Sequence, residues 1–515
     1  MENEEPYNNY YLGIDIKKSI DNIIIICKKD RKKYQIIMEK LFTSFESTFD
    51  FLTKNKMPKK SFNDIKEQMK ENISFLYDKI EDINERSELK NFYLCLSCIY
   101  GAFLGDAIGA FCEFEKPDKN NIKKIFHGKP KFGEKEGQVT DDSEMAMCLS
   151  FGIMDSENLK EINPNIIYCY YGAWFKSKPV DIGSTTRKAL NHFNFDFFSN
   201  DINFEKIFEE IKGTNYNSKA NGFLMRISTF IVWLNYAFKD EIKQSLEKDK
   251  NFLNLYKIIK DEAEKDCKCT HPNSLLPSIS SCFCLLALWA INQLKPNQLI
   301  ENLKSLINNK FFEENKEEKE IKNIILDELK IYDSIKSYKK FNEFDYFTKG
   351  EKTINKKMGY FIHSFRLTLY FIYFFDEIPE NVNKISKYRI IMNKICSFGG
   401  DTDTNAAIVG TVIGPIIGYK NFGIEDFKKM FFLIPKKRNI FIPSLMVLYV
   451  YYLQELYINH NYNHNNTTKE NKFNFLKMIL EFCYCSIDEI LYHINKNQKR
   501  KKTTNSNPCL GCEII

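Results

Sequence analysis

The chain has 515 residues, 43% of them hydrophobic, which is enough to bury a sizeable core in one large domain or several smaller ones. Its 74 lysines and arginines exceed its 68 aspartates and glutamates only slightly, for a formal charge of +6. So small an excess argues against a nucleic-acid-binding surface, and we expect no specific nucleic-acid partner.

The sequence is not typical of a membrane-spanning or exported protein. Its longest apolar runs are interrupted by Pro415 and by Pro443 with Ser444, so none reaches the roughly 18 residues that a spanning helix needs. The N-terminus, MENEEPYNNYYLG, is acidic and polar where a secretory signal is basic and then apolar. We therefore expect a cytoplasmic protein.

The 15 cysteines are scattered through apolar segments, and in the cytosol such thiols stay reduced, so most are predicted to be small core residues. Two pairs, Cys267 with Cys269 and Cys282 with Cys284, raise the alternative of a zinc site. Zinc-binding pairs are usually spaced C-x₂-C, however, and the second pair lies in an apolar, helix-like run. The core interpretation is therefore favoured.

In chain order, residues 1–91 are predicted to form a helical N-terminal extension, because charged and apolar residues recur there at helical spacing. Residues 92–460 form the main domain, whose long apolar segments lack hairpin turn signals, so we predict an all-α fold. Within it, residues 300–357 are rich in Lys, Glu and Asn and are predicted to be a solvated helical insertion. Residues 461–515 comprise a polar linker, a short helix and a basic tail.

Two acidic motifs stand at the start of predicted helices: TDDSEMAMCLS, which begins at Thr140, and GGDTDTNAAIVG, which contains Asp401 and Asp403. Taken alone, the first motif is typical of a helix N-terminus, with Thr140 near the N-cap and acids in the first turn. One acid suffices for capping, so the second acid of each motif needs another explanation. Carboxylates brought together would repel by about 4 kcal/mol for each pair 4 Å apart. A hard cation with oxygen ligands, Mg²⁺ or Mn²⁺, would remove this repulsion.

Three further motifs place polar residues beside apolar sequence. GAFLGDAIGAFCEF contains Asp106 and Glu113, and its glycines allow a close backbone approach that could bring Glu113 to the acidic motifs. SKANGFLMRIS contains Asn221 and Arg226, and CTHPNSL contains His271. A single His or Arg beside apolar sequence is more often structural than functional, so both interpretations stay open for these residues.

The order of the motifs resembles the ADP-ribosylglycohydrolase family, which includes dinitrogenase-reductase-activating glycohydrolase and the ADP-ribosyl-arginine and ADP-ribosyl-serine hydrolases. The resemblance covers about residues 92–425 and is carried by GDAIGAFCE, TDDSEMA, DIGSTT, NGFLMR, THPNS and GGDTDTNAAIVG. It implies a compact all-α fold with a two-metal cleft, holding two Mg²⁺ or Mn²⁺. It also implies hydrolysis of the bond between ADP-ribose and a protein side chain or small leaving group.

The resemblance further implies roles for individual residues. The implied metal ligands are Thr140, Asp141, Asp142, Asp401, Asp403 and Thr404. The implied catalytic residues are Asp142, Asp401 and Glu113, the last moving or polarising the attacking water. The implied substrate contacts are Gly183, Ser184, Asn221, Gly222 and His271.

Some features depart from the family or favour another class. Phe223 and Leu224 stand where the family usually has small residues, so we expect a narrower pocket wall facing the ligand. DTDTN also approaches the nucleophile motif of haloacid-dehalogenase-type phosphatases, but that motif needs Thr or Val where Asn405 stands and a β-strand immediately before it. A third alternative is a non-catalytic relative that binds ADP-ribose.

The C-terminal tail has two interpretations. Its last four residues, Cys512 to Ile515, have the C-a-a-X form of a prenylation site, and Cys509 offers a place for a palmitoyl chain. The preceding KRKK cluster could bind an anionic membrane leaflet, so one hypothesis is peripheral membrane association through a lipidated tail. The other is a disordered basic tail or a nuclear-import signal.

Overall fold

The computed structural model describes residues 90–454, apart from positions 134, 157, 159, 194–201, 248–251, 336, 351–352 and 434–440. The described residues belong to one compact unit, formed by Lys70–Asn194 and Ile202–Tyr462. Almost all of the predicted N-terminal extension, and the whole segment predicted as linker, short helix and basic tail, lie outside the described residues.

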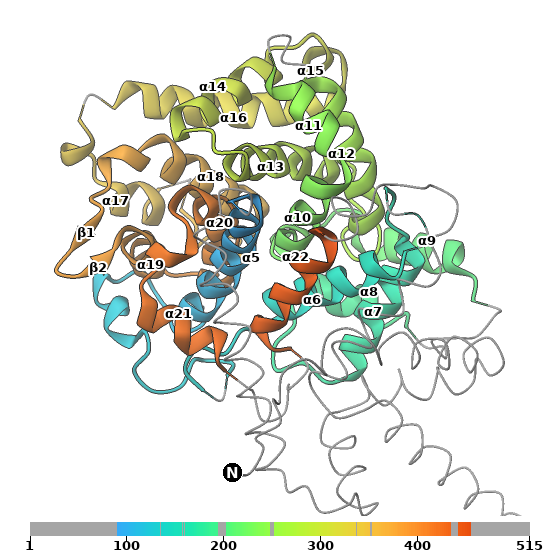
Figure 1. Ribbon diagram of the computed structural model, residues 1–515, viewed down its shortest axis with the longest axis horizontal. Helices are drawn as coiled ribbons and strands as arrows, with labels where there is room; N and C mark the ends of the chain where they lie inside the picture. The colour runs from blue at the N-terminus through green and yellow to red at the C-terminus, as the bar shows by residue number, and fades with distance from the viewer. Residues whose placement is uncertain are drawn as a thin grey trace, which may run out of the picture. The chain divides into compact units, whose positions relative to one another are not determined.

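The predicted all-α fold is confirmed. The α-helices are α5 (Lys90–Gly109), α6 (Asp141–Met154), α7 (Pro164–Lys176), α8 (Ser184–Leu190), α9 (Phe204–Asn215), α10 (Ser228–Ala237), α11 (Lys239–Leu246), α12 (Phe252–Cys267), α13 (Leu276–Ile291), α14 (Pro296–Ile307), α15 (Phe311–Glu314), α16 (Lys316–Ser334), α17 (Glu343–Thr348), α18 (Phe361–Tyr373), α19 (Lys387–Phe398), α20 (Thr402–Ile417), α21 (Ile424–Phe431) and α22 (Met446–Gln454) (Figure 1). Short 3₁₀ helices connect several of them: η3 (Lys119–Lys124), η4 (Asn221–Phe223), η5 (Tyr338–Lys340), η6 (Phe375–Glu377), η7 (Tyr419–Asn421) and η8 (Pro443–Leu445). In the described part of the chain, β structure consists of an isolated bridge and the two-residue strands β1 (Asn381–Val382) and β2 (Ile385–Ser386), which pair antiparallel.

The centre of the unit is the pair α5 and α20, whose backbones approach closely because glycines face each other (Figure 1). A Cβ added to Gly101 would lie 2.2 Å from the carbonyl oxygen of Gly410, and one added to Gly105 would lie 2.3 Å from that of Ala406. No larger residue fits at these positions without moving one helix. The close approach places the start of α20 against the end of α5.

α5 is long and apolar enough to cross a membrane by length and composition, but 94% of its apolar stretch is buried in the folded unit. α13 is also buried along its whole length, including Cys282 and Cys284. The cysteines at the end of α12 and just after it, Cys267 and Cys269, are buried free thiols as well. α5 and α13 are therefore core helices of the folded unit.

The segment predicted as a solvated insertion is largely helical in its described residues, and α16 buries one of its faces. Glu318 on α16 accepts hydrogen bonds from Lys260 at 2.6 Å and from Ser278 at 3.0 Å, which joins α16 to α12 and α13. Glu328 pairs with Arg366 on α18 at 2.8 Å. The described helices of this segment are thus packed against the main domain through buried charges as well as apolar contacts.

Candidate metal centre and active site

The N-terminus of α6 is held by a carboxylate from α5. Asp106 accepts hydrogen bonds from the backbone N–H groups of Thr140 at 3.0 Å and Ser143 at 3.2 Å, and from their hydroxyl groups at 2.9 and 2.5 Å. Thr140 occupies the N-cap position, as predicted, but its side chain makes no capping bond. Because Asp106 caps this helix start through Thr140 and Ser143, the acids of the first turn, Asp141 and Asp142, are not needed as caps.

The N-terminus of α20 likewise leaves acids available. Asp401 is at the N-cap position without a capping bond, and its Oδ2 accepts a hydrogen bond of 2.7 Å from the Nδ2 of Asn221 in η4. The hydroxyl of Thr402 donates to the carbonyl of Gly109 at 2.7 Å, which fixes this turn against the end of α5. The first turn of α20 contains Asp403. Both acids therefore stand beside the turn that follows α5.

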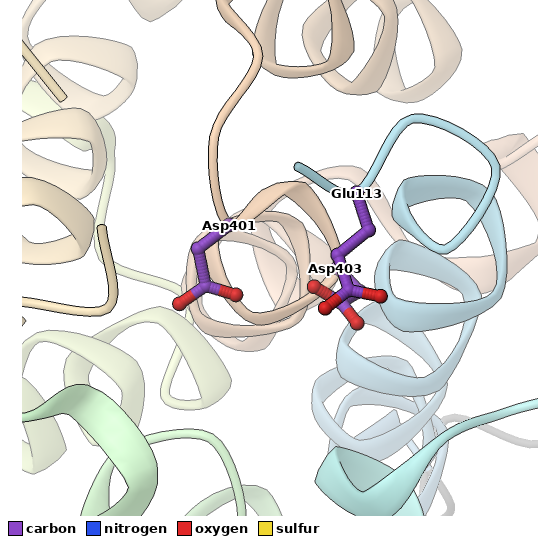
Figure 2. A group of neighbouring side chains, drawn as sticks. All are labelled: Glu113, Asp401 and Asp403. Atoms are coloured by element: carbon purple, nitrogen blue, oxygen red, sulfur yellow. The ribbon is translucent and has the colours of Figure 1, made fainter. Parts of the chain in front are cut away.

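That turn supplies the third carboxylate. Figure 2 shows the side chains of Glu113, Asp401 and Asp403 converging, and one oxygen from each lies within 4.8 Å of those of the other two. All three residues are buried. Among the described residues, this is the one group of three or more His, Cys, Asp or Glu side chains whose geometry suits a metal ion. The two cysteine pairs form no such group there, so the zinc alternative is not supported.

The two acidic helix starts are connected through Asp142. Its Oδ2 accepts hydrogen bonds from the hydroxyl groups of Thr140 at 3.1 Å and Thr404 at 3.4 Å. Its other oxygen is buried with no hydrogen-bond partner among the described residues, as is Oε2 of Glu113. A buried carboxylate oxygen without a donor costs free energy unless a donor or cation from outside the chain meets it. These two oxygens therefore fit the edge of a cation site.

Burial and mutual repulsion raise the pKa values of the acids at this centre. Burial, helped by the charges of Asp181, Asp401 and Asp141, raises the pKa of Glu113 to about 9. Burial also raises the pKa of Asp401. For three further acids, burial followed by neighbouring carboxylates raises the pKa well above the usual range: Asp141, Asp142 and Asp403. The chain alone thus disfavours the charged form of these groups.

The predicted substrate contacts fall in two places. Asn221 reaches Asp401, and Gly222 lies against His271, because a Cβ added to Gly222 would be 2.8 Å from the Cε1 atom of that ring. Burial lowers the pKa of His271 well below its usual value, so the imidazole is neutral near pH 7. Gly183 and Ser184 are exposed at the start of α8. No hydrogen bond within the described residues joins these two to the carboxylates.

Two residues that the sequence analysis did not single out border the carboxylates. Asp181 is half-buried, and its charge contributes to the raised pKa of Glu113. The carbonyl of Gly359 accepts a hydrogen bond of 2.7 Å from the N–H of Asn221, and a Cβ added to Gly359 would lie 3.4 Å from Oδ2 of Asp401. Asp181 stands in the DIGSTT motif, where it could have been noticed. Nothing local marks Gly359, because its position beside Asp401 arises only on folding.

The structure bears on one alternative and one expectation from the sequence. The residues before Asp401 form helix α19 and two glycines, where the haloacid-dehalogenase motif requires a β-strand. Phe223 and Leu224 are buried, and the ring of Phe223 packs against those of His271 and Phe361 with 6.2 Å between centroids in each case. Both residues thus belong to the interior, and the narrower ligand-facing wall stays a prediction.

The acidic residues of the centre all lie in the part of the chain that matches a known family. The model of the ADP-ribosylglycohydrolase family matches residues 92–426. The chain belongs to the ADP-ribosylglycohydrolase family. It is therefore assigned as a glycosidic-bond hydrolase of this family, and the phosphatase alternative is not favoured.

Individual relatives agree with this family. A protein of Acanthamoeba polyphaga mimivirus, named as an ADP-ribosyl glycohydrolase, is 26% identical over 339 residues, which is 62% of this chain and 86% of that protein. The ADP-ribosyl-[dinitrogen reductase] glycohydrolase of Rhodospirillum rubrum is 31% identical over 102 residues, 19% of this chain and 34% of that protein. The ADP-ribosylarginine hydrolase of Serratia proteamaculans is 31% identical over 131 residues, 22% of this chain and 35% of that protein. A solved structure titled ADP-ribosylglycohydrolase-related protein complex superimposes with a TM-score of 0.43 at 16% identity, covering 71% of this chain and 99% of that one.

Proposed function

We propose that this member of the family is a metal-dependent enzyme that removes ADP-ribose from a modified protein side chain or a small ADP-ribosyl conjugate. The carboxylate centre carries the proposal, because Glu113, Asp401 and Asp403 converge there without an ion pair to any described lysine or arginine. Two relatives are named for ADP-ribosylated dinitrogen reductase and for ADP-ribosylarginine. These names support a modified protein side chain as the substrate.

The residues present fit a hard divalent cation. The candidate ligand atoms are all oxygens. Two buried oxygens at the centre, one on the proposed ligand Asp142 and one on the proposed proton-handling group Glu113, have no donor among the described residues. We propose a centre of two Mg²⁺ or Mn²⁺ ions, because oxygen ligands favour these over Zn²⁺. When bound, such ions lower the pKa of water and stabilise developing negative charge. The proposed ligands are Thr140, Asp141, Asp142, Asp401, Asp403 and Thr404.

The side chains around the centre have distinct proposed tasks. In the hydrolysis, a water oxygen bonds to the anomeric carbon as the bond from that carbon to the leaving atom breaks, and the leaving atom receives a proton. Glu113 takes or orients the proton of the attacking water. Its pKa of about 9 in the cation-free chain keeps it protonated near neutral pH, and bound cations would favour its charged form, which can act as a base. Asn221 holds the carboxylate of Asp401 in place through its 2.7 Å hydrogen bond. The predicted substrate contacts stay Gly183, Ser184, Asn221, Gly222 and His271.

The proposal is tested by incubating the full chain with Mg²⁺ and a panel of substrates with defined linkages: ADP-ribosyl-arginine, ADP-ribosyl-serine, O-acetyl-ADP-ribose and an ADP-ribosylated DNA base. Free ADP-ribose is measured, with a general phosphatase substrate run in parallel. We expect release from at least one substrate and its loss on chelation. Release from none, with the metal-loaded protein folded, would point to the non-catalytic alternative. Activity undiminished after exhaustive chelation would exclude the metal role.

We also propose a cytoplasmic location, with peripheral membrane association if the tail is lipidated. Cys509 and Cys512 lie outside the described residues, so this stays a prediction from the sequence. The intact mass of the C-terminal peptide from the native source tests it. A Cys512 without a lipid, still followed by its last three residues, would end the prenylation hypothesis.

A further inference from the structure

Three large apolar side chains are exposed beside the carboxylate centre, on three separate segments of the chain. Phe114 and Met358 are each 47% exposed, and Val180 is 38% exposed. We call these three residues the apolar rim. Each is the immediate neighbour in sequence of a residue at the centre: a carboxylate for Phe114 and Val180, and the glycine beside Asp401 for Met358.

Two members of the rim meet at the residue that precedes Asp401. The N–H of Phe114 donates to the carbonyl of Gly400 at 2.7 Å, and the N–H of Gly400 donates to the carbonyl of Glu115 at 3.1 Å. A Cβ added to Gly400 would lie 3.5 Å from Cγ of Met358. The positions of Phe114 and Met358 are therefore tied to that of the Asp401 carboxylate.

The backbone at the rim is held in conformations that most side chains avoid. Phe114 has φ +55°, and Met358 lies between Lys357 at φ +52° and Gly359 at φ +78°. The left-handed region is unfavourable for a bulky aromatic residue and persists only where surrounding contacts impose it. Here the two hydrogen bonds with Gly400 impose it on Phe114, and the result is an exposed ring next to Glu113.

A lysine side chain packs against one member of the rim. The ammonium of Lys131 lies 4.9 Å from the ring centroid of Phe114 and donates to the backbone carbonyl of Glu113 at 3.1 Å. This contact fixes the ring from one side while about half of Phe114 stays exposed. A surface with exposed Phe, Met and Val side chains suits an apolar stretch of polypeptide. Exposed Lys178, Lys356 and Lys357 stand within two residues of rim members in sequence, so the apolar side chains are bordered by basic ones.

We propose that the apolar rim binds the polypeptide that carries the ADP-ribosyl group, so that this enzyme acts on modified proteins in preference to small conjugates. This inference rests on the proposed hydrolase function. The polypeptide beyond the cleaved bond must lie next to the reacting centre, which is where the rim stands. Aromatic and Met side chains provide much of the contact energy at such interfaces, and Met adapts to varied partners.

The test compares two substrates with the same linkage, a mono-ADP-ribosylated protein and the ADP-ribosylated free amino acid, with arginine as the first linkage. Phe114→Asn keeps a residue that tolerates the left-handed backbone, and Met358→Gln keeps the side-chain volume. The matched control is Val382→Thr, because Val382 is 44% exposed in β1. Val382 belongs to the hairpin that precedes α19, whereas Gly400 follows the other end of this 12-residue helix, which is about 18 Å long.

We expect each rim variant to raise KM for the modified protein by about tenfold, the size of a moderate interface hot spot. Activity on the free amino acid conjugate, inhibition by ADP-ribose, and both activities of the control should stay unchanged. An equal rise in KM for both substrates would show that the rim contacts ADP-ribose itself, and no rise for either would exclude a contact; both overturn the inference. If the unsubstituted enzyme cleaves neither substrate with any linkage of the panel, the proposed function fails. In that case, the dissociation constants of the same two compounds are compared between the unsubstituted enzyme and the rim variants, and this comparison tests the role of the rim.

Discussion

Buried carboxylates occur in two settings in this molecule, which differ in whether the chain supplies a compensating cation. Away from the centre, three of them pair with basic side chains: Asp266 with Arg226 at 3.0 Å, Glu318 with Lys260 at 2.6 Å, and Glu328 with Arg366 at 2.8 Å. At the centre, Glu113, Asp401 and Asp403 face one another, and no described lysine or arginine forms an ion pair with them.

The pKa values express the same difference. Burial acts to raise the pKa of Glu318, but the hydrogen bond and charge of Lys260 lower it below its usual value. Burial and neighbouring acids raise the pKa of Glu113 to about 9. The first arrangement is complete within the chain and serves stability. The second has no compensating cation among the described residues, which supports the proposed cation site.

The largest expected effect is on turnover. Asp401→Asn or Asp142→Asn should reduce ADP-ribose release to background, because each removes a charge from a two-cation centre and an amide of the same shape cannot replace it. Folding should survive, because each change also removes a repelling charge. Enzyme assays and circular dichroism on the same preparations check both parts. Full activity in either variant would contradict the metal assignment.

Asp266→Asn should have the opposite effects, a loss of stability without a direct loss of turnover. It removes one partner of a buried ion pair and leaves Arg226 uncompensated, so the free energy of unfolding should fall by about 3–5 kcal/mol. Urea unfolding with and without chelator measures this, with Asp401→Asn in the chelated state as the matched comparison. If the two variants lost equal stability, the distinction between the two settings would be wrong.

Glu113→Gln should reduce kcat by about 10²-fold or more with a smaller effect on ligand binding, the usual scale for losing a general acid or base. Steady-state kinetics together with the dissociation constant of ADP-ribose separate the two quantities. Equal losses in both would argue that Glu113 is a ligand and not the proton-handling group.

The smallest expected effect is a pH-dependent shift in Tm. The pKa of Glu113 is about 9 in the folded cation-free chain and near 4.3 in the unfolded chain. Its stabilising contribution is therefore present below about pH 4 and is lost as the pH rises toward 9. Added Mg²⁺ should raise Tm more at about pH 8.5 than at about pH 5.5, because binding offsets a repulsion that is larger at high pH. Differential scanning fluorimetry measures the shift; a larger shift at the lower pH would contradict the assignment of uncompensated acids.

The sequence predicted the parts of the site that are formed by residues close together in the chain. Paired acids at the starts of α6 and α20, beyond what capping requires, pointed to a cation centre, and long apolar runs predicted the all-α fold. The sequence did not show that Asp106 on α5 caps α6, because that contact joins residues 34 positions apart. Gly359 and Met358 were missed for the same reason: they reach the centre through backbone pairing with the segment at Asn221.

The most direct test of the account is calorimetric titration of the metal-free protein with Mn²⁺ at neutral pH, in two buffers of different ionisation enthalpy. We expect two ions per chain and release of protons on binding, because the carboxyl groups of the centre must lose the protons that burial lets them keep. Asp401→Asn should weaken or abolish binding, and Asp266→Asn should leave it intact. The absence of binding to the folded protein, or binding that Asp401→Asn does not change, would contradict the claim that these buried acids await a cation from solution.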